Sequence, residues 1–359
     1  MGEIVVVTGA DGAVGRRVVE LALAEPGVER VVAVGLRPGA HPTQSRPATP
    51  TEAELVPAPF PLDDPRLAAL VRGATRLVHL GARRGLDLDG TGGAGVDLLG
   101  TRALLSALAG VATVGTVVVL SSALVYGARR TNPVPLTEDA PVRPNSSIPA
   151  AVERVRLEDM VRAWAAERDA SCALLRPSVV VGPENGKWLS RSPWSTAGLQ
   201  VAGGPAPVQF LHVDDLAAAV ATVCRRGYDG SVNAAPDGWL TADQVKALKG
   251  PAPRVRLRRT VAVRLARWGA RLGIDIGDPA TLIAASAPWV VANDRLRGLG
   301  WEPEFTNEEA YVDADRGGWW ARLTPRHRQQ LSLGGVAGFA VVVLVAAGWF
   351  VRRRLTRRR

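Results

Sequence analysis

Cysteine, histidine and tyrosine are scarce in this sequence of 359 residues, which has two cysteines, four histidines and three tyrosines. Cys172 and Cys224 stand alone, with no Cys-x-x-Cys pair. A disulfide framework or a structural zinc site is therefore not expected. Apolar residues make up 47% of the chain and charged residues 22%, so the chain can bury a sizeable core and disorder is excluded.

The net charge of +10 is concentrated at one end, because six arginines lie within residues 352–359. Without them the charge is +4, which is ordinary for a soluble domain. No aromatic and basic platform or recognition motif accompanies the charge, so nucleic-acid binding is not expected.

Leu331 to Val351 is a run of 21 residues without a charge. As a helix it reaches about 31 Å, close to the thickness of a bilayer's hydrocarbon core, and predicts a single transmembrane helix followed by a basic tail at 352–359. The apolar stretch from Ile4 to Val7 is too short for a signal peptide, so the main domain is expected to be cytoplasmic. The tail's arginines conflict with the positive-inside bias, which leaves its orientation, or a shallow or re-entrant segment, open.

The first 180 residues alternate short β-branched runs with helical stretches, a pattern typical of a parallel sheet covered by helices on both faces. The predicted strands are Glu3 to Thr8, Arg30 to Gly35, Leu55 to Phe60, Arg76 to Leu80, Thr116 to Ser121 and Cys172 to Arg176. The predicted helices are Ala13 to Ala24, Pro65 to Val71, Gly95 to Leu108 and Ile148 to Glu167.

The alternation weakens after Gly182, and two more core elements return, a helix at Val213 to Arg226 and a strand at Ser231 to Ala234. We therefore expect a main core at residues 1–182 and 212–235. A smaller substrate-side subdomain is expected at 183–211 and 236–320.

Glycines recur where the first strand enters the first helix, in the segment Thr8-Gly9-Ala10-Asp11-Gly12-Ala13-Val14-Gly15. A tight turn needs a residue without a side chain, and a diphosphate must approach the backbone N–H groups closely. At the first junction of an alternating chain, this spacing predicts a dinucleotide-binding loop.

Further motifs follow this loop in order along the chain. They are His79 to Ala82, Gly100-Thr101, Ser121 to Gly127, Thr137-Glu138, Arg176-Pro177, Gly182-Pro183, Phe210 to Asp215 and Leu299 to Pro303. With them the sequence resembles the extended short-chain dehydrogenases/reductases of the NAD-dependent epimerase/dehydratase family, over about residues 3–305. The resemblance implies an α/β fold, a Rossmann-like doubly wound parallel sheet with a small inserted substrate-side subdomain.

The resemblance also implies NAD or NADP as the cofactor, and no metal. The residues expected to bind the cofactor are Thr8, Gly9, Asp11, Gly12, Ala13, Val14, Gly15, Arg37, Asp63, Leu80, Gly81, Ala82, Ser121 and Pro177. The family usually has an acid at the end of the second strand, but Gly35 stands there, and no Asp or Glu occurs between Arg30 and Thr51. Arg37, with Arg46, would attract the 2′-phosphate of NADP, unless both are ordinary surface arginines.

The family's chemistry uses a Tyr as acid/base, a Lys four residues later and a Ser or Thr, and only the last survives, as Ser122. The Tyr and Lys positions fall on Ala150 and Arg154, and shifting the register by one or two residues does not restore the pair. Tyr126 and Glu153 are the candidate substitutes for the acid/base, and Arg154 is a candidate contact to ribose hydroxyls. Asp214 and Asp215 are expected to have structural roles.

Two functions remain open. The first is a membrane-anchored NAD(P)-binding protein, impaired in the Tyr/Lys reaction, that works as a sensor or interaction partner. The second is an active epimerase, dehydratase or reductase that acts on a sugar nucleotide or lipid-linked substrate with an unusual acid/base. A homodimer is also left open.

The segment from Arg254 to Leu272 is rich in arginine. On a helix beginning near Thr260, Arg264, Arg267 and Arg271 share one face, whereas Val261, Leu265, Trp268 and Leu272 share another. This pattern indicates either an ordinary amphipathic helix with a solvated arginine face or a helix that rests on anionic lipid.

Overall fold

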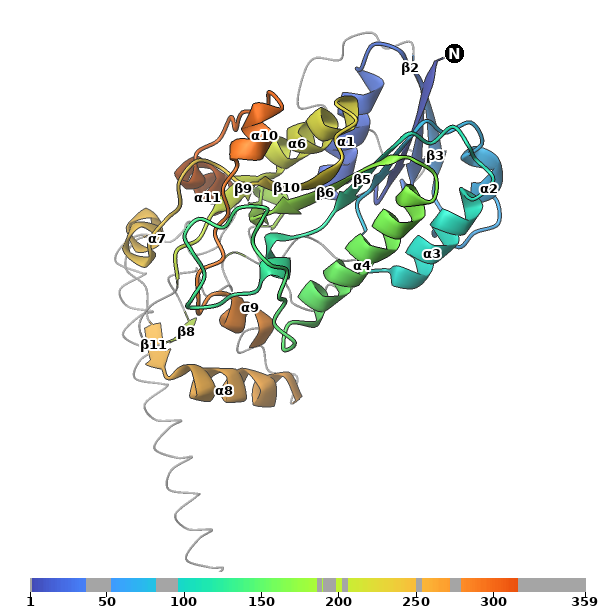
Figure 1. The fold of residues 1–359 in the computed structure, drawn as a ribbon. Coiled ribbons are helices and arrows are strands. Elements are labelled where there is room, and N and C mark those ends of the chain that lie inside the picture. Colours follow the sequence, from blue (N-terminus) through green and yellow to red (C-terminus); the bar gives the residue numbers. More distant parts are fainter. Residues whose placement is uncertain are drawn as a thin grey trace, which may run out of the picture.

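The computed structural model describes residues 2–36, 53–81, 96–185, 189, 198–201, 206–249, 254–271 and 279–315. Within them, seven parallel strands form one sheet in the order β10-β6-β5-β4-β1-β2-β3 (Figure 1). They are β1 (Glu3–Thr8), β2 (Val28–Val34), β3 (Glu54–Ala58), β4 (Arg76–His79), β5 (Thr116–Leu120), β6 (Ser171–Pro177) and β10 (Gly230–Ala234). The chain order reverses between β1 and β4, the place where open α/β sheets bind ligands.

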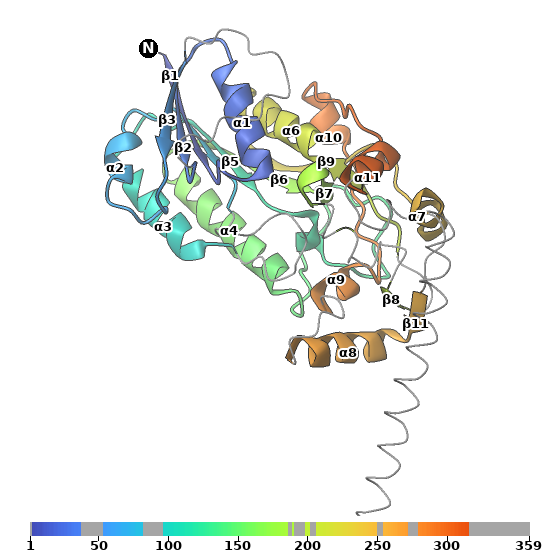
Figure 2. The ribbon, with the colours of Figure 1, turned by 180° about the vertical axis from the view of Figure 1, so that it is seen from behind.

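Helices cover both faces of this sheet, as the two opposite views in Figures 1 and 2 show. One face carries α1 (Ala13–Leu23) and α6 (Val213–Arg225), and the other carries α2 (Leu67–Leu70), α3 (Leu98–Ala107) and α4 (Pro149–Ala166). Val5 and Val7 belong to the first core, and Val6, between them, belongs to the second. This burial on both sides explains the continuous apolar runs and confirms the predicted α/β doubly wound sheet.

The element bounds differ from the predictions by a few residues. β2 begins two residues before the predicted Arg30, because Val28 pairs with Glu3. The predicted helix at Gly95 to Leu108 begins only at Leu98, because the Asp97 carboxylate caps it and accepts a hydrogen bond from Gly100 N at 2.9 Å.

A second layer of structure lies beyond the carboxyl end of β6 (Figure 1). The short strands β7 (Val179–Val181) and β9 (Phe210–His212) pair in parallel, as do β8 (Gly198–Val201) and β11 (Arg254–Leu257). The helical elements of this layer are η1 (Ala123–Tyr126), η2 (Pro183–Asn185), α7 (Ala242–Lys249), α8 (Arg259–Arg271), α9 (Pro279–Ala284) and α11 (Asn307–Asp315). Helix α10 (Asp294–Gly298) instead packs on the first core through Leu296. A third hydrophobic core, which includes Phe210, Trp289 and Tyr311, holds the layer together.

In the part of the chain that the structure describes, no helix is both long enough and apolar enough to cross a bilayer. The predicted transmembrane run at 331–351 and the basic tail at 352–359 lie outside that part. So do Arg37, Arg46 and Ala82.

Candidate functional site

The glycine loop between β1 and α1 forms a tight turn with no room for a side chain at Gly15 and an unfavourable backbone conformation for one at Gly9. Gly9 adopts φ +70°, in the left-handed region that favours glycine. A Cβ on Gly15 would lie 2.1 Å from the Gly9 carbonyl oxygen and 2.8 Å from the Ala10 Cα. Helix α1 therefore packs directly on the backbone of the turn, which is the role predicted for the spaced glycines.

No side chain caps the N-terminus of α1, and no acidic side chain lies in its first turn. The N-cap residue is Gly12, which offers no side-chain hydrogen bond. Backbone N–H groups and the helix dipole make such a terminus a binding place for an anion. The loop thus fits the diphosphate of a dinucleotide, with Ala13, Val14 and Gly15 as the residues that would face it.

His79 joins the ends of β1 and β4 beside this loop. Its Nδ1 lies 2.8 Å from the Thr8 hydroxyl and its Nε2 lies 2.9 Å from the Thr101 hydroxyl. Burial lowers the pKa of His79 to about 4, so the imidazole is neutral at physiological pH. Leu80 and Gly81 follow at the carboxyl end of β4, and a Cβ on Gly9 would lie 3.4 Å from the Leu80 Cβ. The structure therefore brings these predicted cofactor residues together with the glycine loop.

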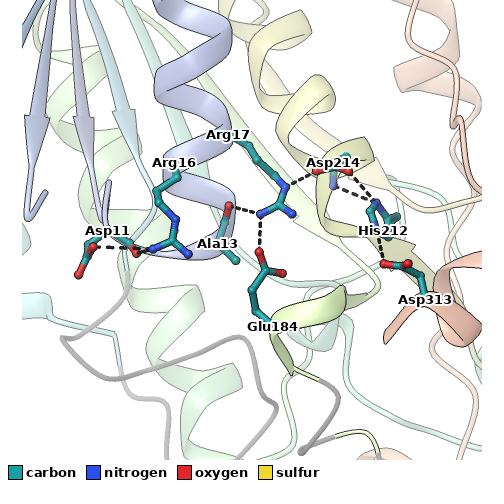
Figure 3. A network of polar contacts seen from close by, with 8 residues as sticks. All are labelled: Asp11, Ala13, Arg16, Arg17, Glu184, His212, Asp214 and Asp313. Carbon is teal, nitrogen blue, oxygen red and sulfur yellow. Dashed lines mark hydrogen bonds and ion pairs between the residues drawn. The ribbon is translucent and has the colours of Figure 1, made fainter. Parts of the chain in front are cut away.

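The other predicted cofactor residues occupy more varied places. Asp11 pairs with Arg16, whose Nη1 donates to the Asp11 carbonyl at 2.7 Å (Figure 3). Asp63 is exposed in the turn after β3. Pro177 ends β6, where it pairs with Ala234 of β10. At the end of β2, Gly35 takes φ +93°, a backbone conformation that side chains rarely adopt. The position therefore lacks the family's acid, and an acid placed there would strain the backbone.

Ser121 is held by a buried network. Its hydroxyl donates to the Glu158 carboxylate at 2.5 Å, and Glu158 forms an ion pair with Arg176 at 2.6 Å, with both charged side chains 3% exposed. These contacts fix the carboxyl ends of β5 and β6 against α4, and Ser121 stays a predicted cofactor contact.

Helix α4 places Ala150 in its first turn and Arg154 one turn later. The Arg154 guanidinium donates through Nη1 to the Leu120 carbonyl at the end of β5. A Cβ on Gly81 would lie 3.4 Å from the same nitrogen. Burial lowers the pKa of Arg154 to about 10, and nearby Glu158 and Glu153 oppose the shift, so Arg154 remains cationic at neutral pH. The Lys position thus carries a fixed cation bonded to the backbone, and the Tyr position carries a methyl group.

The two candidate substitutes for the acid/base are engaged elsewhere. Tyr126 is 2% exposed, its hydroxyl donates to Asn233 at 2.9 Å and accepts from Arg176 at 3.0 Å, and burial raises its pKa. The Glu153 carboxylate accepts a hydrogen bond from Val96 N at 2.8 Å. Both sets of contacts favour structural roles.

Ser122 begins η1, where its hydroxyl accepts from Leu124 N at 3.2 Å. It is only partly buried. Of the candidates for catalysis, Ser122 is therefore the one that combines the family's residue type with partial access to solvent.

Arg17 forms a charged network beside the loop that sequence reasoning missed (Figure 3). Its guanidinium is bonded to Asp214 at the start of α6, to Glu184 of η2 at 2.9 Å and to the Ala13 carbonyl at 2.9 Å. The Asp215 carboxylate accepts from the backbone N–H groups of Glu304 and Phe305. The structural roles expected for the two adjacent acids are therefore confirmed.

Ser178, directly after Pro177, was also missed by sequence reasoning. It is 6% exposed, and its hydroxyl has no hydrogen-bond partner within the described residues. A buried polar atom without a partner at this edge of the sheet is a place that a bound ligand would satisfy.

The parallel sheet, its switch point and the uncapped glycine loop together define a dinucleotide-binding protein. A family model described as "NAD dependent epimerase/dehydratase family" matches residues 5–235, and the chain belongs to this family. Membership confirms the predicted family and the expected class of cofactor, a nicotinamide dinucleotide.

The chain is also similar to individual proteins and solved structures. Uncharacterized proteins of Mycobacterium bovis and Mycobacterium tuberculosis are 26% identical over 94% of this chain and 90% of their own length. Among solved structures, gox2253 shares 26% identity with a TM-score of 0.61, covering 90% of this chain and 98% of its own. MoeE5 in complex with UDP-glucuronic acid and NAD shares 21%, with a TM-score of 0.60 and coverage of 89% and 99%. UDP-glucose 4-epimerase of Thermotoga maritima shares 18%, with a TM-score of 0.61 and coverage of 89% and 98%.

Proposed function

We propose that this protein is a membrane-anchored NAD(P)-binding member of its family that has lost the Tyr/Lys reaction and works as a nucleotide-dependent sensor or interaction partner. The observation that carries the proposal is the first part of α4, with Ala150 and Arg154 at the Tyr and Lys positions. An alanine has no proton to exchange, and loss of a positioned acid/base costs on the order of 10²- to 10⁴-fold in rate.

The residues that remain are suited to binding. The turn at Gly9–Gly15 would hold the diphosphate, and Leu80, Gly81 and Ser121 would line the edge where the nicotinamide half lies. When bound, a nicotinamide dinucleotide can accept or donate a hydride. This chain contributes Ser122 as the one partly exposed hydroxyl among the catalytic positions predicted from the family. The family's NAD-bound neighbours support the choice of ligand.

The anchoring part of the proposal rests on the uncharged run at 331–351 and the arginines that follow it. Such a run is long enough for one crossing of the hydrocarbon core. The main domain would then work at the membrane surface, on the cytoplasmic side.

An active enzyme is the second candidate. It is favoured by the sugar-nucleotide complexes of the fold's neighbours and by the partner-free Ser178 hydroxyl at the edge of the sheet. In this case the substrate would be a sugar nucleotide or a lipid-linked sugar, and the acid/base would be a group other than a Tyr/Lys pair.

The test uses the full chain in lipid nanodiscs. Titration with NADH and NADPH, followed by energy transfer from tryptophan, measures binding. After addition of NAD(P)⁺ and UDP-glucose or UDP-glucuronic acid, chromatography of the sugar nucleotide measures turnover, because an epimerase or dehydratase returns the hydride to the sugar and leaves no net change in absorbance at 340 nm. We expect binding without turnover. Turnover that Ser122→Ala abolishes would overturn the sensor proposal in favour of the enzyme, and absence of binding to either dinucleotide would overturn both.

A gain-of-function variant sharpens this test. Ala150→Tyr combined with Arg154→Lys restores the family's pair at the i, i+4 spacing on one face of α4. We expect slow hydride transfer to appear in the double variant and not in Ala150→Phe combined with Arg154→Lys, which matches its bulk without the hydroxyl. Equal activity in the wild type and both variants would contradict the assignment of these positions.

A further inference from the structure

Helix α8 buries two small residues and exposes two large apolar ones. Ala262 and Ala266 are buried, whereas Val261 is 42% exposed and Trp268 is 56% exposed. Burying a tryptophan removes far more apolar surface from water than burying an alanine, so a helix adapted only to water would present the opposite faces. The sequence left open an ordinary amphipathic helix with a solvated arginine face and a helix that rests on anionic lipid, and the exposed Val261 and Trp268 favour the second.

The outward face of α8 combines apolar and cationic groups. Arg264 stands at the border between the predicted arginine face and the predicted apolar face. It lies three residues after Val261 and four before Trp268, so its side chain is a neighbour of both. Arg258, just before the helix, and Arg264 are both exposed. We call Val261, Arg264 and Trp268 the outer face of α8.

The opposite side of α8 fixes the helix to the body of the protein. Val263 packs against a small cluster formed by α9 and the start of α4, whose members are Ile148, Ala151, Ala280, Ile283 and Ala284. In both views α8 lies at one end of the molecule, beyond α9 and away from the main sheet (Figures 1 and 2). The outer face therefore belongs to a helix held in place rather than to a detached one.

The charge of this region has one sign. Residues 254–271 contain seven arginines and no aspartate or glutamate. An exposed tryptophan among arginines suits the boundary of a bilayer, where the indole lies at the level of the headgroups and the guanidinium groups meet anionic lipid. A protein partner would not require such a complete absence of acids, whereas an anionic surface favours it.

We propose that the outer face of α8 lies on the anionic surface of a lipid bilayer. The proposal builds on the anchoring proposed above, and is independent of dinucleotide binding. Residues 316–330, between the last described residue and the uncharged run, span up to about 50 Å when extended, so an anchored chain can bring α8 to the bilayer that holds it. Docking would set the orientation of the main domain relative to the membrane.

The experiment places an environment-sensitive dye at the outer face. The full chain with Trp268→Cys is labelled and reconstituted into vesicles of phosphatidylcholine alone or with added phosphatidylserine. The native Cys172 and Cys224 are buried, so the label enters at residue 268. Val312→Cys, on an exposed position of α11 distant from α8 in both views, is the matched control.

We expect the label at 268 to shift to the blue and to be shielded from aqueous iodide in the anionic vesicles only, with reversal at high salt. The label at 312 is expected not to change. Adding Arg264→Glu exchanges a cation for an anion at the surface, and we expect docking to weaken about tenfold.

Three outcomes would overturn the proposal. They are equal emission at 268 in both kinds of vesicle, an equal shift at 312, and shielding that follows protein concentration rather than lipid charge, which would assign the face to a second copy. NADH titration of the same samples reports the dinucleotide site separately, so failure of docking and failure of the proposed nucleotide binding are distinguishable.

Discussion

Gly15→Ala tests the dinucleotide site most directly, because the change adds one methyl group where the backbone leaves no room. The new Cβ would lie 2.1 Å from the Gly9 carbonyl oxygen, and real Cβ contacts below 3.0 Å are essentially never seen. The atoms nearest to this Cβ are backbone atoms of Gly9 and Ala10, which cannot move aside as a flexible side chain would. The loop and the helix must therefore separate by about an ångström.

The size of the effect follows from that displacement. Hydrogen bonds lose most of their strength when a distance of about 2.9 Å grows by an ångström. A hydrogen bond to a charged group contributes about 1.5–3 kcal/mol, so losing one N–H contact to a diphosphate weakens binding by about 10- to 100-fold. The crowding itself is expected to lower the free energy of unfolding by about 1–3 kcal/mol.

The assay is titration of NADH and NADPH into the full chain, with circular dichroism and thermal unfolding to confirm that the variant is folded. Gly12→Ala provides a milder second variant, since its Cβ would lie 3.3 Å from the same oxygen. Gly110→Ala is the matched control, because nothing lies within 4 Å of its added Cβ. A folded Gly15→Ala that binds either dinucleotide as tightly as the wild type would refute the assignment of the loop.

Three further predictions concern stability and location. Glu158→Gln removes one partner of the buried pair with Arg176 and should lower the free energy of unfolding by about 3–5 kcal/mol in urea. Glu54→Gln, which breaks an exposed pair with Arg30, should change it by no more than about 1 kcal/mol, and equal losses would contradict the role given to burial. The pKa of His79 falls from 6.5 unfolded to about 4 folded, so the unfolded chain binds more protons and stability is lost as pH falls through that window, by about 2 kcal/mol between pH 7 and pH 5. His79→Gln should remove this part of the pH dependence, and an unchanged slope in urea titrations would disprove it. Deleting residues 331–359 should move the protein from the membrane fraction to the soluble fraction, and a full chain that is already soluble would refute the anchor.

The main sheet could be predicted from the sequence because its signals are local. The run Val5-Val6-Val7 places apolar side chains on both faces of one strand. The spacing of Gly9, Gly12 and Gly15 reflects contacts between the turn and the helix that directly follows it. The absence of any Tyr with a Lys four residues later can also be read from the sequence, and it assigns Ala150 and Arg154 of one predicted helix to the family's positions. In each case, residues close in sequence carry the information.

Contacts between distant segments could not be predicted in the same way. Arg17 meets Glu184 and Asp214, which lie 167 and 197 residues further along the chain, and no pattern links these positions. The sequence left the exposure of Trp268 open, because helical periodicity gives the faces of α8 but not which of them packs on α9. The role of Asp97 as a helix cap became evident only from its contact with Gly100.

The ion pairs of Arg17 connect the nucleotide loop at the start of α1 to η2 in the second layer and to the start of α6. One guanidinium clamps the start of α1 to the segment after β7 and to the start of α6, and its side chain is only 8% exposed. A ligand that displaces the loop must therefore either carry η2 along or break the clamp. If the protein is a nucleotide-dependent sensor, as proposed, that linkage is a route by which an occupied loop would shift η2 and the start of α6.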